Sequence, residues 1–378
     1  MELAPTLSAT TAAHGRPDAP KVKFNGSDRF IRELRRRVDG YFEHTGLPRR
    51  DCPQMYFKTA TILAWFSAAY LLLMFFATSW WLIVPLAVVL GLSVAAIGFN
   101  IQHDGNHRAY SNRPWVNKIM ALSLDVMGGS SYLWDWKHNS IHHTYPNVDG
   151  QDDDIDVGMF GRLSPHQKHY WFHRMQGIYL WGLYGFLAIK WHFFDDFYNV
   201  AVGRIGERKI PRPKGKDLGV FIGGKVIFFS IAFVIPMLLH PVMDVLAVYA
   251  MAAFVSGVVL SVVFQLAHCV EGANFPQPVA TSEGHARLDT DWAVHQVTTT
   301  VDFARGNRVL CWLLGGLNFQ VEHHLFHKIC HVHYPALSKV VEEACHECGV
   351  RYRSHKTFFG AVASHYRWLV QMGRPNPA

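Results

Sequence analysis

The sequence predicts an all-α integral membrane protein, with four transmembrane helices in two hairpins and a cytoplasmic helical cap. Two observations support this fold class. The chain has 378 residues, of which 50% are hydrophobic and only 17% are charged. In addition, residues 59–102, 226–243 and 245–270 contain no Asp, Glu, Lys or Arg. Because a helix needs about 20 consecutive apolar residues to cross a bilayer, these stretches hold four spans and exclude an ordinary soluble enzyme.

The chain begins with a segment of a different composition. Residues 1–28 are rich in Ala, Pro and Thr and have no apolar core, which predicts a disordered tail rather than a signal peptide or a span. Residues 29–58 are expected to form a basic cytoplasmic segment. The membrane domain is then expected over residues 59–355, and residues 356–378 are expected to form a C-terminal tail.

The uncharged stretches predict two helical hairpins. In the first hairpin, the spans are expected at about 62–78 and 82–100, with tryptophans between them that suit the membrane interface. In the second hairpin, the spans are expected at about 220–239 and 245–267, joined by a turn at Pro241.

The distribution of basic residues predicts the orientation. Neither turn between spans contains Lys or Arg, whereas the segments outside the hairpins are rich in both. By the positive-inside rule, the N-terminus, the 101–219 loop and the C-terminal segment therefore lie in the cytoplasm. Lys225, near the start of the third span, is expected to extend its side chain to the interface. The uncharged segment 175–189 is too short to span and is expected to lie on the membrane surface.

Histidines gather in three motifs, among 23 in the chain. His-Asp-Gly-Asn-His occupies 103–107, at the end of the second span, and His-Asn-Ser-Ile-His-His occupies 138–143. Gln-Val-Glu-His-His occupies 320–324, and His268 ends the fourth span. Because residues four apart share a helix face, the first two motifs each present a pair of imidazoles to one point. The predicted topology places all these histidines at the same membrane face.

These eight histidines exceed what one metal ion takes, so the pattern predicts a site for two ions. Imidazole suits iron, zinc or copper, and the six scattered cysteines do not favour an iron–sulfur or structural zinc site. A Glu-x-x-His spacing occurs once, at 343–346, which does not suit a carboxylate-bridged di-iron bundle. The chain has no His-Glu-x-x-His motif of a zinc protease. The pattern therefore indicates oxygen chemistry on a lipid-soluble substrate.

The three motifs resemble the histidine boxes of the membrane fatty acid desaturase family, and the resemblance covers roughly residues 55–355. It implies that the cap holds two iron ions, which use dioxygen and two electrons to remove two hydrogens from an acyl chain. His268 matches the additional histidine that such enzymes place at the end of the fourth span. The metal ligands implied by the resemblance are His103, His107, His138, His142, His143, His268, His323 and His324.

Two details of the resemblance bear on subtype. Gln320, which opens the third motif, resembles the front-end subgroup, which desaturates between an existing double bond and the carboxyl end. The chain has no His-Pro-Gly-Gly haem motif of a fused cytochrome b5, so electrons are expected from a separate ferredoxin or cytochrome b5 with its reductase. This form resembles bacterial members and favours the bacterial inner membrane over the endoplasmic reticulum. His327 stands where relatives have proline and is left out of the ligand set.

Several polar residues near the motifs are candidates to support the ligands, because carboxylates commonly accept the distal N–H of metal-bound imidazoles. An acidic loop of this kind could equally be solvated or bind a partner. The candidates are Gln320, Asp104, Glu322, Asp152 and Asp154.

Trp134 and Trp136 precede the second motif and could line a channel for the acyl chain, although aromatic residues near a membrane also serve as interfacial anchors. The basic surface could attract an acidic electron donor or the phosphates of acyl-CoA or a phospholipid. The positive-inside rule alone would also produce it. The expected substrate is a membrane lipid or acyl-CoA, no nucleic-acid partner is expected, and the oligomeric state stays open.

Two other functions stay open at this point. A hydroxylase or ketolase of the same superfamily, acting on an alkane, sphingolipid or carotenoid, would use similar ligands. A histidine-rich metal transporter or sensor is a more remote alternative, since transport sites usually lie near the middle of the bilayer. The lone Cys-x-x-Cys at 345–348 is not interpreted as a metal site.

Overall fold

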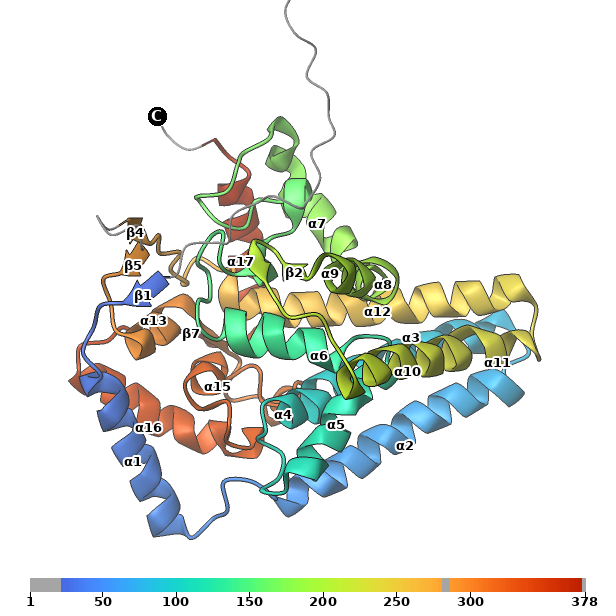
Figure 1. Cartoon of the computed structure of the whole chain (residues 1–378), viewed down its shortest axis with the longest axis horizontal. Coiled ribbons are helices and arrows are strands. Elements are labelled where there is room, and N and C mark those ends of the chain that lie inside the picture. The colour runs from blue at the N-terminus through green and yellow to red at the C-terminus, as the bar shows by residue number, and fades with distance from the viewer. Residues whose placement is uncertain (1–21, 281–285, 376–378) are drawn as a thin grey trace, which may run out of the picture.

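The computed structural model describes residues 22–280 and 286–375. Four long helices project from one side of the molecule, where they lie beside one another (Figure 1). They are α2 (Pro53–Phe75), α3 (Trp80–Ile97), α10 (Lys216–Phe229) and α12 (Val242–His268). With their helical continuations, each is long and apolar enough to cross a membrane. The prediction of an all-α membrane protein with four transmembrane helices is confirmed.

The helix ends differ from the predicted spans. α2 begins at Pro53, well before residue 62, because proline suits the first turn of a helix and the basic segment continues into it. The helix that starts with α3 continues to Asn106, so it carries the first histidine motif on its last turns. Similarly, the helix that starts with α10 ends at Met237. Hydropathy marks the apolar part of a helix and not its ends.

Four π-helical segments interrupt the helices in the described residues: η1 (Gly98–Gln102), η2 (Asp135–His142), η6 (Trp191–Asp195) and η7 (Ser230–Val234). A π-helical turn contains one more residue than an α-helical turn and often lies at a functional site. Here η1 leads directly into the first histidine motif, and η2 contains most of the second.

The cap packs the N-terminal helix against C-terminal helices. α1 (Arg29–Thr45) lies against α13 (Trp292–Thr299) and α16 (Tyr334–Glu347), and α15 (Gln320–Phe326) packs against both of the latter. Their shared core is apolar and includes Leu34, which is fully buried. The third histidine motif is therefore held on a short helix that is enclosed by three others.

Short elements connect the cap to the long helices. The helices are α4 (His103–Asn106), α5 (Pro114–Val126), α6 (Ser131–Trp134), α7 (Gln176–Tyr184), α8 (Leu187–Lys190), α9 (Asp196–Val202), α11 (Ile235–Met237), α14 (Arg308–Leu313) and α17 (Phe358–Met372). The 3-10 turns are η3 (Asp153–Ile155), η4 (Gly158–Phe160), η5 (Trp171–Met175) and η8 (His331–His333). The segment expected on the membrane surface becomes α7 and α8, which pack against α12.

Three small sheets complete the fold. Parallel strands β1 (Val22–Phe24) and β5 (Ala286–Leu288) pair with each other, and β4 (Val279–Ala280) joins β5 in the antiparallel direction. The other sheets are two-stranded: β2 (Arg204–Ile205) pairs with β3 (Arg208–Lys209), and β6 (Asp302–Phe303) pairs with β7 (Ser354–His355).

Both predicted tails need correction. Residues 22–24 of the expected disordered tail form β1, whose Val22 is buried and whose backbone accepts a hydrogen bond from the Tyr145 hydroxyl. Residues 1–21 lie outside the described part of the chain. The expected C-terminal tail contains α17, which packs against α7 and α12 and buries Trp368 and Leu369. The apolar residues of this segment are spaced as on one face of a helix. The segment therefore folds as a helix, although its composition resembles that of a tail.

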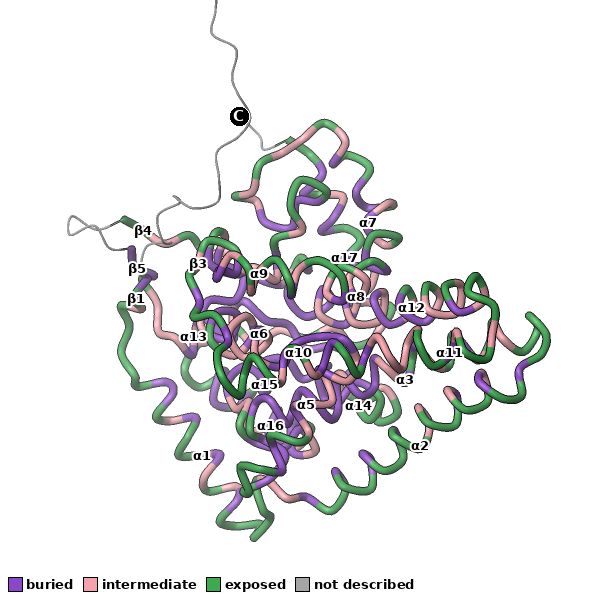
Figure 2. The backbone as a smooth tube through the Cα atoms, turned by 45° about the vertical axis from the view of Figure 1, so that its right-hand side comes forward, coloured by how far each residue is buried: buried purple, intermediate pink, exposed green. Residues whose placement is uncertain are grey.

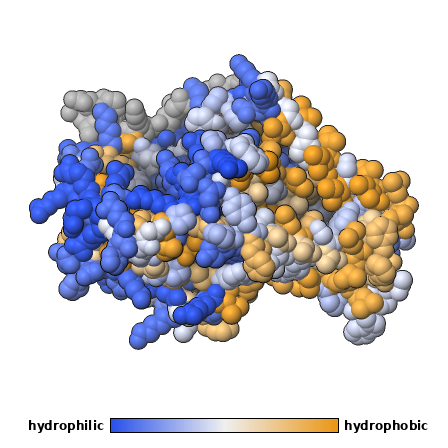
Figure 3. All heavy atoms as spheres, turned by 90° about the horizontal axis from the view of Figure 1, so that it is seen from below, coloured by the Kyte–Doolittle hydropathy of each residue, from blue (hydrophilic) through white to orange (hydrophobic). Residues whose placement is uncertain are grey.

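The surface divides along the long axis of the molecule. Figure 2 shows many exposed residues along the projecting ends of the long helices, and Figure 3 shows that this end is largely hydrophobic whereas the cap end is hydrophilic. Exposed side chains here include Leu71, Phe75, Leu92 and Leu238. Exposed apolar surface of this extent matches contact with lipid.

Lys225 differs from its prediction. Its ammonium group does not reach the interface but is buried in the fold, 2.7 Å from the Asp196 carboxylate. It also donates to the carbonyl of Gly128 at 2.6 Å. A buried charge is tolerated when it is paired and hydrogen-bonded, so this lysine joins α10 to α9 and the loop after α5.

Candidate metal centre and substrate cavity

Four segments far apart in the sequence bring eight histidines together: the end of the α3 helix, η2 with its following residue, the end of α12, and α15. All eight are buried, and none is more than 9% exposed. The set is His103, His107, His138, His142, His143, His268, His323 and His324. Their nitrogens form groups close enough to hold metal ions.

The first group consists of four histidines from three segments: His103, His107, His138 and His323. Their candidate ligand atoms all lie within 4.8 Å of one another. The ring of His103 lies 4.5 Å from that of His323, centroid to centroid, and 4.6 Å from that of His107. The first motif thus faces the third, as the predicted shared membrane face requires.

The second group joins His142, His268 and His324. The ring of His142 lies 4.7 Å from that of His268 and 5.0 Å from that of His324. His143 lies beside both groups, since its ring is 4.6 Å from that of His107 and 4.4 Å from that of His324. The arrangement therefore offers two adjacent positions with one histidine between them.

The π-helical turn of η2 accounts for the position of His143. Its backbone N–H donates to the carbonyl of His138, five residues earlier, at 3.0 Å. As a result, the Nε2 atoms of the two residues lie 3.2 Å apart. An α-helical turn would have placed His143 on another side of the helix from His138.

Hydrogen bonds orient several of these rings through Nδ1. The Nδ1 of His142 lies 3.0 Å from the Asp152 carboxylate, and the Nδ1 of His324 lies 2.8 Å from Oε1 of Gln296. When Nδ1–H donates, the lone pair on Nε2 is free for a metal. The Nε2 atoms of His142, His324 and His323 are buried without a hydrogen-bond partner. Such orphaned nitrogens fit a metal ion, and both groups are built from imidazole, which suits iron, copper or zinc.

Burial controls the protonation of these rings outside the spans. It lowers the pKa of His138 to about 4 and lowers the pKa values of His107, His143, His323 and His324 well below the usual value. Burial also acts to lower the pKa of His142, but the neighbouring carboxylates of Asp152 and Asp154 outweigh it and raise that pKa. Neutral imidazole is the form that binds metal.

Two of the predicted supporting carboxylates contact ligand candidates. Asp152 holds His142, as described, and also accepts the backbone N–H groups of Asn147 and Asp154. Asp154 lies 3.7 Å from Nδ1 of His138 and forms an ion pair with Lys137 at 3.2 Å. Both carboxylates therefore lie behind the second motif.

The other predicted supports behave differently. Gln320 does face the centre, because its Nε2 lies 3.0 Å from Nε2 of His268. Asp104 instead lies 3.0 Å from Nδ1 of His331, whose other nitrogen meets Lys58. Glu322 points to the other side of α15, where it accepts a hydrogen bond from Tyr352 at 3.0 Å. Adjacent residues of a helix face different directions, so a carboxylate inside a motif need not face the metal.

Three contacts come from residues that the motifs did not indicate. Gln296 on α13 orients His324, and Tyr334 at the start of α16 lies 3.4 Å from Nδ1 of His323. The side chain of Asn147 donates to the carbonyls of His268 and Thr299 at 2.9 and 3.1 Å. No sequence spacing links these residues to the motifs. His327, excluded earlier, packs its ring 5.1 Å from that of His107 but belongs to neither group.

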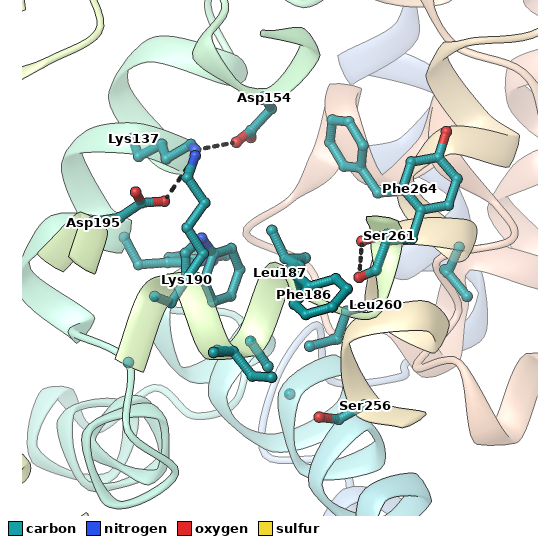
Figure 4. Close-up of a pocket in the computed structure, with 18 of the residues that line it drawn as sticks. Lys137, Asp154, Phe186, Leu187, Lys190, Asp195, Ser256, Leu260, Ser261 and Phe264 are labelled. Atoms are coloured by element: carbon teal, nitrogen blue, oxygen red, sulfur yellow. Dashed lines mark hydrogen bonds and ion pairs between the residues drawn. The ribbon is translucent and has the colours of Figure 1, made fainter. Parts of the chain in front are cut away.

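A cavity of about 620 Å³ reaches this centre. It is lined in part by His103, His138 and Gln320, and the rest of its wall is mainly apolar. Leu187, Leu260 and Phe264 point into it in Figure 4, where the charged pairs Lys137–Asp154 and Lys190–Asp195 gather on one side. A cavity of this size and character suits an elongated apolar ligand with a polar end.

The two tryptophans, Trp134 and Trp136, lie in different positions relative to this cavity. Trp134 lines it and stacks on His138, with ring centroids 4.3 Å apart. Trp136 does not line it; its side chain packs instead on an apolar cluster that includes Leu133 and Ile141. The channel prediction therefore agrees with the position of Trp134 and not with that of Trp136, because neighbouring helical residues point in different directions.

The fold and the site together define a membrane protein with a histidine-rich candidate metal centre beside an apolar cavity. The family model for fatty acid desaturase matches residues 79–356. The chain belongs to the fatty acid desaturase family. It is accordingly an oxidoreductase of lipid metabolism, as the three histidine motifs predicted.

Named relatives agree over nearly the whole chain. An sn-1 linoleoyl-lipid 6-desaturase of Arthrospira platensis is 40% identical over 93% of this chain and 95% of its own length. One of the same name from Synechocystis sp. is 38% identical over 94% of this chain and 99% of its own length. An acyl-lipid (8-3)-desaturase of Physcomitrium patens is 36% identical over 91% of this chain and 72% of its own length. These names favour desaturation over the hydroxylase, ketolase and transporter alternatives.

Proposed function

We propose that this protein is an oxygen-dependent di-iron desaturase that acts on the acyl chain of a membrane lipid near its carboxyl end. The observation that carries the proposal is the convergence of two adjacent histidine groups, one of which lines an apolar cavity through His103 and His138. The names of the relatives, which are lipid desaturases, support the same reaction and substrate class.

Two iron ions would occupy the two histidine groups. His103, His107, His138 and His323 would hold one ion, His142, His268 and His324 would hold the other, and His143 would complete one of them. When bound, the irons supply the oxidation that removes two hydrogens from adjacent carbons with dioxygen and two electrons. Asp152 and Gln296 would fix the ring orientation of His142 and His324.

The cavity wall would position the acyl chain of the substrate. Its apolar side chains exclude water and hold the acyl chain extended past the centre, so that position along the chain decides which carbons reach the irons. Trp134 lines the cavity and stacks on His138, so it would contact the chain and hold the ring of His138 in place. No polar side chain can hold a particular methylene group in place. The position of the new double bond therefore depends on where the polar end of the lipid is bound.

The polar end of the lipid would bind close to the centre. Lys137 adjoins His138 in the sequence and pairs with Asp153 and Asp154 at the cavity wall. A head group held beside this cluster keeps the carboxyl end of the chain within reach of the histidines. This supports front-end chemistry, in line with the 6-desaturase names of two relatives.

The orientation and the partners form part of the proposal. The cap and both termini would lie in the cytoplasm of a bacterial inner membrane, since the turns between spans have no Lys or Arg while the cap is basic. A ferredoxin, or a cytochrome b5 with its reductase, would supply electrons as a separate protein. The net charge of +7 favours a donor with an acidic surface.

Metal analysis combined with lipid profiling tests this proposal. Purified protein is expected to contain about two irons per chain, and cells that express it are expected to gain a new double bond in membrane acyl chains. His142→Ala and His323→Ala should lose both iron and product while still inserting into the membrane. His346→Ala, an exposed histidine away from the centre, is the matched control and should keep both. Zinc alone, or full iron in the first two variants, would overturn the assignment.

A further inference from the structure

A second cavity, of about 410 Å³, lies among the four long helices. Its wall comes from α2, α3, η7, α11 and α12, with contributions from α5, α10 and η6, and it is mostly apolar. Typical lining residues are Phe66, Leu73, Ile231 and Val248. None of the eight clustered histidines lines it, so this space is not part of the metal centre.

The two cavities adjoin each other. Val94, Met127, His192 and Ser256 line both of them, and these four residues therefore form the boundary. In Figure 4, Ser256 lies at the opposite end of the labelled residues from Lys137 and Asp154. Lys137 adjoins His138 in the sequence, whereas Val94 lies nine residues before His103 on one continuous helix. An acyl chain with its polar end beside Lys137 would therefore pass the histidines before it reaches this boundary.

The boundary suits a hydrocarbon chain. The Ser256 hydroxyl donates to the carbonyl of Ala253 at 3.0 Å, so it has a partner within its own helix. His192 lies 2.9 Å from the Tyr249 hydroxyl, which fixes its ring, and burial lowers its pKa to about 3. The histidine is therefore neutral near pH 7, and no charge blocks passage between the cavities.

We propose that the second cavity receives the methyl end of the acyl chain, and that Val94 and Ser256 at the boundary set the longest chain the protein accepts. This inference rests on the proposed function and extends it to chain-length specificity. A short chain ends within the first cavity, whereas a longer chain crosses the boundary. A bulkier side chain at the boundary should therefore lower the desaturation of long chains and leave that of short chains unchanged.

Val94 offers a matched pair of variants on one helix. Val94→Phe places a ring at the boundary, and Val88→Phe adds the same volume at an exposed position of α3 that lines neither cavity. Ser256→Leu tests the same boundary from α12. Because removing or adding one methylene in an apolar pocket changes specificity by about 10–200-fold, a filled boundary should shift it at least tenfold.

The experiment measures desaturation in membranes supplied with myristoleoyl, palmitoleoyl or oleoyl chains, which differ in length but carry a double bond at the same distance from the carboxyl end. Val94→Phe and Ser256→Leu are expected to lower the ratio of oleoyl-derived to myristoleoyl-derived product at least tenfold, with iron content unchanged, while Val88→Phe keeps the wild-type ratio. An unchanged ratio in both boundary variants, or an equal loss at every chain length, would overturn the proposal.

A second measurement does not depend on turnover. A phospholipid whose acyl chain carries a diazirine at its methyl end is bound by the full chain and photolysed. The label is expected on residues of the second cavity in the wild type and on residues of the first cavity in Val94→Phe. Label confined to the first cavity of the wild type would refute the inference. If labelling succeeds but neither the wild type nor any variant forms a double bond, the proposed desaturase function is wrong. The binding of an acyl chain across the two cavities is then still supported.

Discussion

The carboxylate of Asp152 lies 3.0 Å from Nδ1 of His142, and both side chains are shielded from solvent. The pair links an acidic loop to a histidine of the second metal group, and the carboxylate has further backbone donors on either side. The pair explains how the ring is aimed, since donation from Nδ1 leaves Nε2 directed at His268 and His324.

Replacing this carboxylate should weaken metal binding. Asp152→Asn keeps the size of the side chain but removes the charge that favours the donated proton, so iron affinity is expected to fall by about 10–100-fold. Competition with a chelator of known affinity measures it. Asp289→Asn, at an exposed position, is the control, and equal affinity in both variants would contradict the role of Asp152.

Gln296 should behave in a related way on the other side of the centre. Gln296→Ala removes the acceptor 2.8 Å from Nδ1 of His324 and is expected to lower iron affinity by about tenfold or more. Gln296→Glu restores an acceptor and should recover most of the affinity. Gln296→Met keeps much of the side-chain volume without an oxygen acceptor, so it should bind iron as weakly as Gln296→Ala. Iron titration of the three variants measures this, and recovery of affinity in Gln296→Met would mean that only packing was lost.

The buried pair Lys225 and Asp196 should show strong coupling. Lys225→Met leaves the Asp196 carboxylate buried without its cation, which is expected to destabilise the protein by about 3–5 kcal/mol. The double variant Lys225→Met with Asp196→Asn removes both charges and should regain much of the loss. Thermal unfolding in detergent checks this expectation, and additive effects of the two changes would count against a coupled pair.

Asp302 should make stability depend on pH. Burial raises its pKa to about 6, above the usual 3.8, so the folded protein holds a proton that the unfolded chain has released. The stabilising contribution is present below about pH 4 and is lost as the pH rises through about 6. Relative to wild type, Asp302→Asn should therefore gain about 3 kcal/mol of stability as the pH rises from about 4 to about 7.

Unfolding at several pH values measures this difference between the variant and the wild type. Burial also raises the pKa of Glu322, and the facing Asp302 adds to the effect, so Glu322→Gln should show the same sign. A difference that does not change with pH would mean that Asp302 titrates normally in the folded protein.

The long helices could be predicted from the sequence because a membrane span is a local property. Twenty apolar residues suffice to specify it, whatever they pack against. The ends could not be predicted as well: Pro53 extends α2 into a segment that is basic and polar, and the π-helical η1 continues α3 through His103. Both features depend on how the helices meet the cap.

The histidine groups could be predicted because spacing and topology agreed. The π-helical turn that brings His143 to His138 could not, since an extra residue in a turn has no clear signature in composition. Asp104 and Glu322 lie inside the motifs yet face away, whereas Gln296 contacts His324 from a separate helix. Which polar group reaches a ligand depends on tertiary packing.

The ring of His103 lies 4.5 Å from that of His323, although these residues are 323 − 103 = 220 positions apart in the chain. During synthesis, the first motif emerges long before the third, because α15 follows both hairpins in the chain and docks against α13 and α16. A chain that ends before α15 lacks His323 and His324, so both histidine groups are incomplete. The centre closes when the last segment of the cap folds, so capacity to bind metal marks a finished molecule.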